Sequence, residues 1–242
     1  MNEGIKNNIK YLFRRYIGFD PSLRKVTLNE DFLDQKKLLR NTSIRIIFDV
    51  GANVGQTTRK YRKLFPRATI YAFEPFPSSL NIYKNHTCGD KRIKTYELAL
   101  TDTVGEKIFY ANDCHYTNSL LPVDTEHRGT ENYNPTEKIN VSTSTLDFIC
   151  SDESIDNINI LKMDIQGGEL LALKGAENML KARKIDLIYT EVAYQTTYIN
   201  QPTLTDLEDY LKPFGYVLYK KYNTDFDKDN KPISGDAIFI KK

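Results

Sequence analysis

The sequence predicts an α/β domain in which a mostly parallel sheet of seven strands carries helices on both faces. From about residue 44 onward, short apolar runs rich in β-branched residues alternate with segments of helical periodicity. A turn with two glycines directly follows the first apolar run, as in nucleotide-binding domains of this class. The last two strand-like runs have no helix between them, which predicts an antiparallel hairpin at the sheet edge.

Two helix-like segments precede the first strand and form an N-terminal helical extension, residues 1–42, to a domain of residues 43–242. Residues 5–19 present an apolar face flanked by Lys and Arg. Such a face packs on its own domain or else docks on a membrane surface or a partner, and we favour the first interpretation. Residues 28–40 predict the second helix, with Asn29 as its N-cap.

The turn after the first strand lies in the segment IRIIFDVGANVG, residues 44–55, and leads into a helix over residues 54–64. Gly51 lets the backbone approach a ligand without an intervening Cβ, and Gly55 lets the helix pack closely on the sheet. The second strand ends at Glu74, whose carboxylate is placed to accept hydrogen bonds from the two hydroxyls of a ribose. The glycine turn and the carboxylate together predict a cofactor that contains adenosine.

The spacing of this turn favours S-adenosylmethionine over a nicotinamide dinucleotide. The dinucleotide pattern G-x-G-x-x-G needs a glycine where this chain has Asn53, and S-adenosylmethionine has no diphosphate to cradle. Asp49 is then placed to hold the ammonium group of the methionine part, directly or through water. In the alternative interpretation, Asp49 and Asn53 only cap the turn and the helix.

Residues 93–100 predict the third strand, at the end of which Ala99, Leu100 and Asp102 are expected beside the adenine ring. Asp102 either accepts a hydrogen bond from the exocyclic amine or starts the turn before Gly105. An insertion of about residues 104–145 follows. Its two ends, residues 104–110 and 138–145, alternate like solvated strands and predict an antiparallel flap.

The middle of this insertion, residues 111–137, is polar and without periodicity, which is typical of a lid or a binding loop. His115 in this loop is a candidate general base, because its ordinary pKa lies near neutral pH. A lone histidine in a loop is more often a surface residue.

The C-terminal half repeats the alternation of strands and helices. The predicted strands are residues 157–165, 185–192, 215–222 and 236–241, and the predicted helices are residues 170–182 and 204–212.

Carboxylates follow two of these buried strands, with Asp164 at the end of one and Glu191 at the end of the next. An open α/β sheet binds its ligands at this edge. A functional interpretation assigns Asp164, Glu169 or Glu191 to substrate hydroxyls, proton removal or a divalent metal ion. A structural interpretation makes Asp164 the N-cap of the next helix and Glu169 an acid in its first turn.

Composition restricts the partners. A net charge of +2, from 34 basic and 32 acidic residues, gives no electrostatic reason to expect nucleic acid. No apolar run approaches the roughly 20 residues that span a bilayer, and no secretory leader is recognisable. Three widely spaced cysteines form no zinc motif or disulfide framework, so we expect a cytoplasmic protein. Three histidines disfavour a His-based metal site, whereas a carboxylate-bound divalent metal stays open. The oligomeric state is not predicted.

Several motifs in the same order resemble the FkbM-type family of S-adenosylmethionine-dependent methyltransferases. The similarity runs from about residue 28 to the C-terminal strand through the segments NEDFLDQ, FDVGANVGQ, AFEP, ELALTD, STLDF, LKMDIQGGELLALKGA and GDAIFIK. The resemblance implies a Rossmann-like class I methyltransferase fold. It also implies, most often, O-methylation of a hydroxyl on a sugar, glycan or natural product.

The resemblance also implies roles for single residues. The cofactor site would include Asp49, Gly51, Asn53, Gly55 and Glu74, with Asn118 and Ser119 in a loop that approaches the cofactor. Asp164 would face the methyl group. Gln166 departs from the family pattern, since many relatives have Glu there, and this weakens the case for a metal bound by that turn. The resemblance implies no secure catalytic base.

Three functions remain to be compared. The first is an O-methyltransferase for a small-molecule or glycan acceptor. The second is a non-catalytic cofactor-binding scaffold in a glycan-assembly complex, which would bind the cofactor without turnover. The third, a nicotinamide-dependent oxidoreductase, is disfavoured by the glycine pattern. Methylation of nucleic-acid amines is disfavoured because Asp164 is followed by Ile-Gln-Gly-Gly rather than by a Pro-Pro-aromatic turn.

Overall fold

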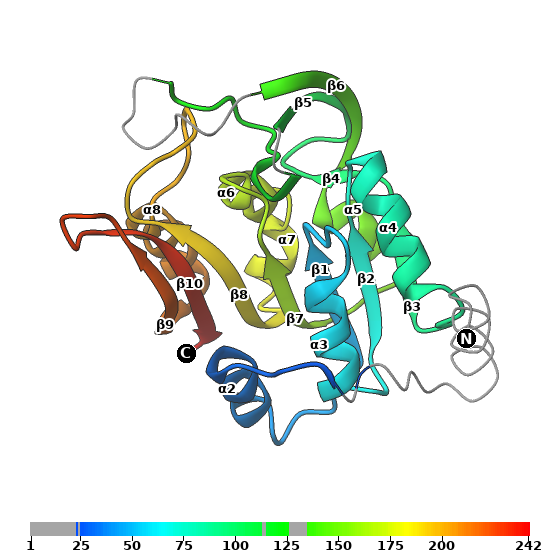
Figure 1. The fold of residues 1–242 in the computed structure, drawn as a ribbon. Coiled ribbons are helices and arrows are strands. Elements are labelled where there is room, and N and C mark those ends of the chain that lie inside the picture. Colours follow the sequence, from blue (N-terminus) through cyan, green and yellow to red (C-terminus); the bar gives the residue numbers. More distant parts are fainter. Residues whose placement is uncertain (1–22, 24, 113–114, 126–134) are drawn as a thin grey trace.

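Two β-sheets form the framework of the computed structural model, which describes residues 23, 25–112, 115–125 and 135–242 (Figure 1). The larger sheet has seven strands in the order β3-β2-β1-β7-β8-β10-β9. Its strands are β1 (Ile46–Val50), β2 (Thr69–Phe73), β3 (Ile93–Tyr96), β7 (Ile158–Met163), β8 (Ile185–Ala193), β9 (Tyr216–Phe226) and β10 (Pro232–Lys241). The smaller sheet, in the order β4-β6-β5, contains β4 (Ala99–Leu100), β5 (Gly105–Asn112) and β6 (Pro135–Ser144).

Strand direction in the larger sheet agrees with the prediction. β1 pairs in parallel with β2 and β7, and parallel pairing continues outward to β3 and β8. β10 runs antiparallel to both β8 and β9. The expected mostly parallel sheet with an antiparallel C-terminal hairpin is confirmed. The strand order reverses between β1 and β7, and α/β sheets bind ligands at such a switch point.

Helices cover both faces of the larger sheet, because its strands are apolar on both sides. One face packs against α2 (Glu30–Leu38), α3 (Gln56–Leu64) and α4 (Pro77–Thr87). The other packs against α5 (Leu146–Asp152), α6 (Glu169–Lys174), α7 (Glu177–Lys181) and α8 (Leu204–Leu211). Two short 3-10 turns, η3 (His115–Thr117) and η4 (Lys212–Phe214), complete the described chain.

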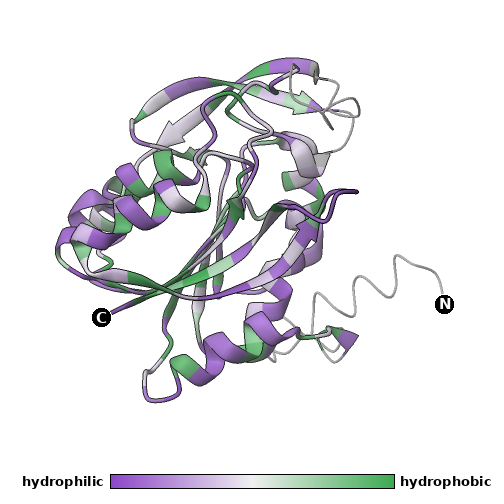
Figure 2. Cartoon of the chain, turned by 90° about the vertical axis from the view of Figure 1, so that its left-hand side faces the viewer, coloured by the Kyte–Doolittle hydropathy of each residue, from purple (hydrophilic) through white to green (hydrophobic). Residues whose placement is uncertain are grey.

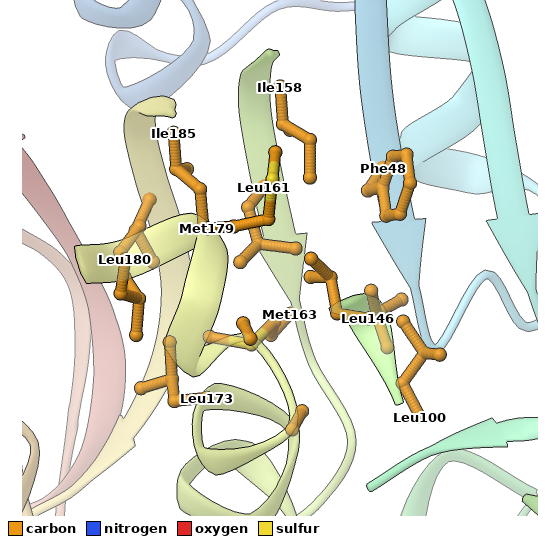
Figure 3. Packing of buried hydrophobic residues seen from close by; sticks show 14 of the residues in the cluster. Phe48, Leu100, Leu146, Ile158, Leu161, Met163, Leu173, Met179, Leu180 and Ile185 are labelled. Carbon is orange, nitrogen blue, oxygen red and sulfur yellow. The ribbon is translucent and has the colours of Figure 1, made fainter. Parts of the chain in front are cut away.

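Alternate residues of β1 enter the two cores: Phe48 and Val50 belong to one cluster of buried residues and Ile47 to the other. Figure 3 shows the first cluster, which includes Phe48 and Leu161 of the sheet, Leu146 of α5 and Leu180 of α7. In Figure 2 the helices alternate between hydrophilic and hydrophobic residues, as expected for helices that cover a sheet with one side only.

The N-terminal helix α2 shares a core with the rest of the domain. Phe32 is 2% exposed and its ring contacts the rings of Tyr61 and Tyr189. Asn29 occupies the predicted N-cap position but makes no side-chain capping hydrogen bond. The predicted helix over residues 5–19 lies outside the described residues. Among the residues that the structure describes, no helix combines the length and apolarity needed to cross a bilayer.

The predicted third strand, residues 93–100, is divided between the two sheets. β3 pairs with β2 in the larger sheet, whereas β4 pairs with β6 in the smaller sheet. The chain bends at residues 97–98, and the backbone after this bend bonds to β6, where Thr101 N donates to Ser144 O at 2.9 Å. The prediction of one continuous strand was therefore wrong.

The predicted helix over residues 170–182 is also two elements, because the chain turns at Gly175. A Cβ on Gly175 would lie 2.0 Å from the carbonyl oxygen of Thr101, so two backbones touch there. A second helix, α7, begins after the turn. The Asp147 carboxylate of α5 accepts hydrogen bonds of 2.8 and 3.1 Å from two N–H groups in the first turn of α7.

The smaller sheet forms the expected flap. β5 and β6 pair antiparallel over most of their length, which confirms that prediction. Figure 1 shows this sheet beyond the carboxyl ends of β1 and β2, at the ligand-binding edge of the larger sheet.

Candidate active site

A cavity of about 340 Å³ lies between the carboxyl ends of the central strands and the smaller sheet. The turn after β1, the end of β2, and the strand ends at Asp164 and Glu191 supply one part of its wall. A further part comes from Ala99 and Leu100 of β4, Phe109 of β5, and Tyr116, Asn118 and Leu120 of the following loop. This volume is of the size that binds small molecules and cofactors.

The structure brings many of the predicted cofactor residues to this cavity. Those that line it are Gly51, Asn53, Glu74, Ala99, Leu100 and Asn118. Asp49, Gly55, Asp102 and Ser119 lie outside its lining.

Glu74 is held rigidly at the tip of β2. Its side chain is buried, and its two oxygens accept hydrogen bonds from Asn53 N (2.8 Å) and Phe76 N (2.9 Å). Burial raises the pKa of Glu74, and the two backbone hydrogen bonds oppose that rise. A carboxylate has about four lone-pair sites, so both oxygens still have room for ribose hydroxyls.

The part of the cavity beside β4 and β5 fits a purine ring. Leu100, Phe109 and Leu120 give it apolar walls. Asn118 adds one polar group: its Oδ1 accepts from Asn112 N at 2.8 Å, which fixes the orientation of the amide. Its Nδ2 is buried and has no hydrogen-bond partner among the described residues. An unsatisfied buried donor between apolar walls suits a ring that carries nitrogen acceptors.

The two glycines of the turn are required by packing within the protein. Gly51 has φ +72°, and a Cβ there would lie 1.9 Å from the carbonyl oxygen of Asp164. Gly55 has φ +94°, and its Cβ would lie 3.2 Å from the Tyr83 ring of α4. Both positions therefore allow close packing of neighbouring segments around the turn.

Asp49 forms a buried ion pair behind the cavity. Its carboxylate lies 3.1 Å from Lys162 Nζ and accepts a 2.6 Å hydrogen bond from Thr58 Oγ1. Lys162 lines the cavity and also donates to Val50 O (3.2 Å) and Gly51 O (2.8 Å), which fixes the glycine turn. Burial lowers the pKa of Lys162, but the carboxylates of Asp49 and Asp164 outweigh burial and raise it.

Sequence reasoning missed Lys162, although the signal was present. FDV and LKM each place one charged residue inside an apolar strand, and the parallel register puts Asp49 opposite Lys162. A charge pair shared by two neighbouring buried strands indicates a buried ion pair.

The second predicted group of acids converges at the cavity. Asp164 is exposed toward it and Glu191 is half-buried; both line it. Gln166 lies between them, and its Nε2 donates to Asp164 Oδ1 (3.1 Å) and to Glu191 Oε2 (2.7 Å). Removal from water raises the pKa of Glu191, and the negative charges of Asp164 and Glu169 raise it further.

Glu169 takes a different place from its two neighbours. It is 3% exposed, lies outside the cavity lining, and accepts from Ile165 N at 3.0 Å. Burial raises its pKa to about 7. Gly168, not Asp164, is the N-cap of α6. In the described part of the chain, no group of three His, Cys, Asp or Glu side chains is arranged to hold a metal ion.

Two further predicted site residues, Asp102 and Ser119, make hydrogen bonds that fix loop segments. Asp102 accepts from Lys107 Nζ and Thr101 Oγ1, both at 2.9 Å. Ser119 Oγ donates to Gln166 O at 2.6 Å, so it ties the loop to the turn after β7. The side chain of His115 lies outside the described residues, although its backbone begins η3.

Tyr116 is a cavity residue that was named only as part of the loop. Its hydroxyl accepts a 3.3 Å hydrogen bond from Gln56 Nε2 of α3, so the two side chains meet beside the cavity.

The charges around the cavity favour a cationic ligand. Glu74, Asp164 and Glu191 place three carboxylates in the described lining, and Lys162 contributes a single ammonium group. An excess of negative charge in a partly enclosed space attracts positive charge. Together with the ordered carboxylate of Glu74 and the apolar slot, this lining fits S-adenosylmethionine, whose sulfonium and ammonium groups are positive.

Comparison with known proteins gives the same assignment. The family model described as methyltransferase FkbM domain matches residues 49–218. The 2-O-methyltransferase NoeI of Sinorhizobium fredii (strain NBRC 101917 / NGR234) is 26% identical over 224 residues, which cover 90% of each chain. Methyltransferase 1 of Beauveria bassiana (strain ARSEF 2860) is 30% identical over 148 residues, 54% of this chain and 58% of that protein.

The fold has solved counterparts. The METTL16 methyltransferase domain superposes with a TM-score of 0.51 at 11% identity, over 97% of this chain and 78% of that one. At this identity the likeness concerns the fold alone. The family match over residues 49–218 carries the functional assignment: the chain belongs to the FkbM methyltransferase domain family and is an S-adenosylmethionine-dependent methyltransferase.

Proposed function

We propose that this enzyme methylates a hydroxyl group of a sugar, glycan or natural-product acceptor. The observation that carries the proposal is the pair of carboxylates, Asp164 and Glu191, in the same cavity as Glu74. Carboxylates accept hydrogen bonds from hydroxyl groups and can remove their protons. The similarity to a 2-O-methyltransferase over 90% of the chain supports an oxygen acceptor.

On the cofactor side, the proposal assigns three contacts. Glu74 binds the ribose, Asn118 Nδ2 faces the purine ring, and Leu100 forms part of the apolar slot. Asp49 acts on the cofactor site indirectly. Its carboxylate forms an ion pair with Lys162, and the Lys162 ammonium group donates a hydrogen bond to the carbonyl of Gly51. Bound S-adenosylmethionine supplies a methyl group already activated by the positive sulfur.

On the acceptor side, the protein has to orient the hydroxyl and take its proton. As the new O–C bond forms and the S–C bond breaks, the hydroxyl proton must pass to a base, because a sugar hydroxyl is a poor acid. Asp164 is exposed to the cavity and available to orient the hydroxyl. Burial and the negative charges of Asp164 and Glu169 raise the pKa of Glu191, which makes its carboxylate a candidate to receive the proton.

The test replaces Asp164 by Asn, which keeps the shape and removes the charge. We expect turnover with a methyl-accepting sugar or glycan, found by screening a panel with radiolabelled S-adenosylmethionine, to fall about 100-fold or more. Affinity for S-adenosylhomocysteine, measured by calorimetry, should change less than about threefold.

Asp152→Asn, at an exposed position on α5, is the matched control and should behave as wild type. Unchanged turnover in Asp164→Asn would remove Asp164 from the mechanism. A protein that binds the cofactor but methylates no acceptor in the panel would instead favour the scaffold.

A further inference from the structure

We infer that Gln166 is a positioning residue whose side-chain amide takes the place of a cation between Asp164 and Glu191. One nitrogen, Nε2, lies 3.1 Å from Asp164 Oδ1 and 2.7 Å from Glu191 Oε2. A primary amide has two N–H donors on that nitrogen, one for each carboxylate. Gln166 therefore links the two acids that the proposed function places beside the acceptor.

Two carboxylates at one site repel each other, and a shared hydrogen-bond donor reduces that repulsion. Like charges close together disfavour ionisation of one of them, and proteins offset this with a cation or with hydrogen-bond donors. Lys162 cannot supply that donor, because its Nζ already contacts Asp49 and the carbonyls of Val50 and Gly51. Between the two acids, the neutral amide supplies the donors.

The amide is fixed in the orientation that this role requires. The hydroxyl of Tyr198, a buried residue, shares its proton between Gln166 Oε1 (3.1 Å) and Thr117 O (2.8 Å). With Oε1 engaged as an acceptor, Nε2 must face the carboxylates. The backbone is fixed as well, since Gln166 has φ +53° and its carbonyl accepts from Ser119 Oγ at 2.6 Å.

The consequence concerns metal ions. While the Gln166 amide lies between Asp164 and Glu191, its two N–H donors offset the repulsion between the carboxylates, so no divalent cation is required there. A carboxylate at position 166 would remove both donors and add a third negative group aimed at the same point. Three carboxylates with open lone pairs are the ligands that hard divalent cations prefer.

The experiment measures binding of Mn²⁺ alone, by electron paramagnetic resonance, to wild type, Gln166→Glu and Gln195→Glu. Gln195 lies outside the cavity lining and donates to Pro232 O at 3.0 Å, so its variant adds the same charge elsewhere. We expect Gln166→Glu to bind one Mn²⁺ at least about tenfold more tightly than wild type, a gain of about 1.4 kcal/mol. Gln195→Glu should match wild type, and Asp164→Asn added to Gln166→Glu should abolish the gain.

Two results overturn the inference. One is an equal Mn²⁺ affinity in Gln166→Glu and Gln195→Glu, in a Gln166→Glu protein that still binds S-adenosylhomocysteine. The other is a metal peak between Asp164 and Glu191 in wild-type crystals soaked in MnCl₂, a measurement that does not depend on the variant folding; absence of the peak supports the inference. No acceptor is needed, so the outcome stays separate from the test of the proposed function.

Discussion

Glu74 is the residue on which the proposed ribose contact depends. Its two oxygens are held by backbone N–H groups and face the cavity, so it offers an ordered acceptor for two hydroxyls. Glu74→Gln keeps the shape but replaces one charged acceptor by a donor. We expect the Kd for S-adenosylhomocysteine to rise at least about tenfold, since a hydrogen bond to a charged group contributes about 1.5–3 kcal/mol.

Calorimetry measures this change, and Glu97→Gln, at an exposed position, is the control. An unchanged Kd for Glu74→Gln would show that the ribose lies elsewhere.

Lys162 and Asp49 matter for stability because their charges are buried together. Replacing Lys162 by Met leaves the Asp49 carboxylate without its ion-pair partner, and we expect a loss of about 3–5 kcal/mol in the free energy of unfolding. The double variant Asp49→Asn, Lys162→Met should recover part of this loss, because neither charge is then buried alone. Urea unfolding measures both, and a loss below about 1 kcal/mol in the single variant would argue against a strong pair.

At the level of elements, the break between α6 and α7 depends on a cap supplied by another helix. Asp147 of α5 accepts from two N–H groups in the first turn of α7. Asp147→Ala should lower the free energy of unfolding by about 1–2 kcal/mol, as for loss of a helix cap. Asp152→Ala, an acid at the exposed end of the same helix, should have almost no effect. Equal losses in the two variants would mean that the cap contributes nothing specific.

The same break shows where local sequence patterns stop being sufficient. The apolar periodicity of residues 170–182 fits one helix, and nothing local reveals that Gly175 meets the backbone of Thr101. β3 and β4 were merged for the same reason, since pairing with β6 depends on a segment far along the chain. Strand direction was predictable, because the alternation of strands with helices and the missing helix before β10 are local signals.

At the scale of the whole molecule, the buried carboxyl of Glu169 makes stability depend on pH. Burial raises its pKa from 4.5 to about 7, so the folded protein binds this proton more tightly than the unfolded chain does. Its contribution to stability is complete below pH 4.5 and is lost as the pH rises through about 7.

Glu169→Gln cannot titrate and keeps an acceptor for Ile165 N. We expect the difference in free energy of unfolding, variant minus wild type, to increase on the order of 2 kcal/mol between those pH values. Urea unfolding at a series of pH values measures it. Parallel pH curves for the two proteins would contradict the assignment.

The positions of Glu74 and Asp164 at one cavity were predictable, because a carboxylate directly after a buried strand is a local signal. The site was not predictable where side chains act through each other. Asp49 was expected to face the ligand, whereas its carboxylate contacts Lys162 and Thr58. Gln166 was recognised only as a departure from a pattern, since its contact with Glu191 depends on how β7 and β8 lie side by side.

The short strand β4 has a mechanical consequence. Ala99 and Leu100 form one wall of the cavity, yet their backbone pairs with β6 of the flap and not with the larger sheet. Leu100 also packs in the core of the larger sheet, so this wall joins the flap to that core.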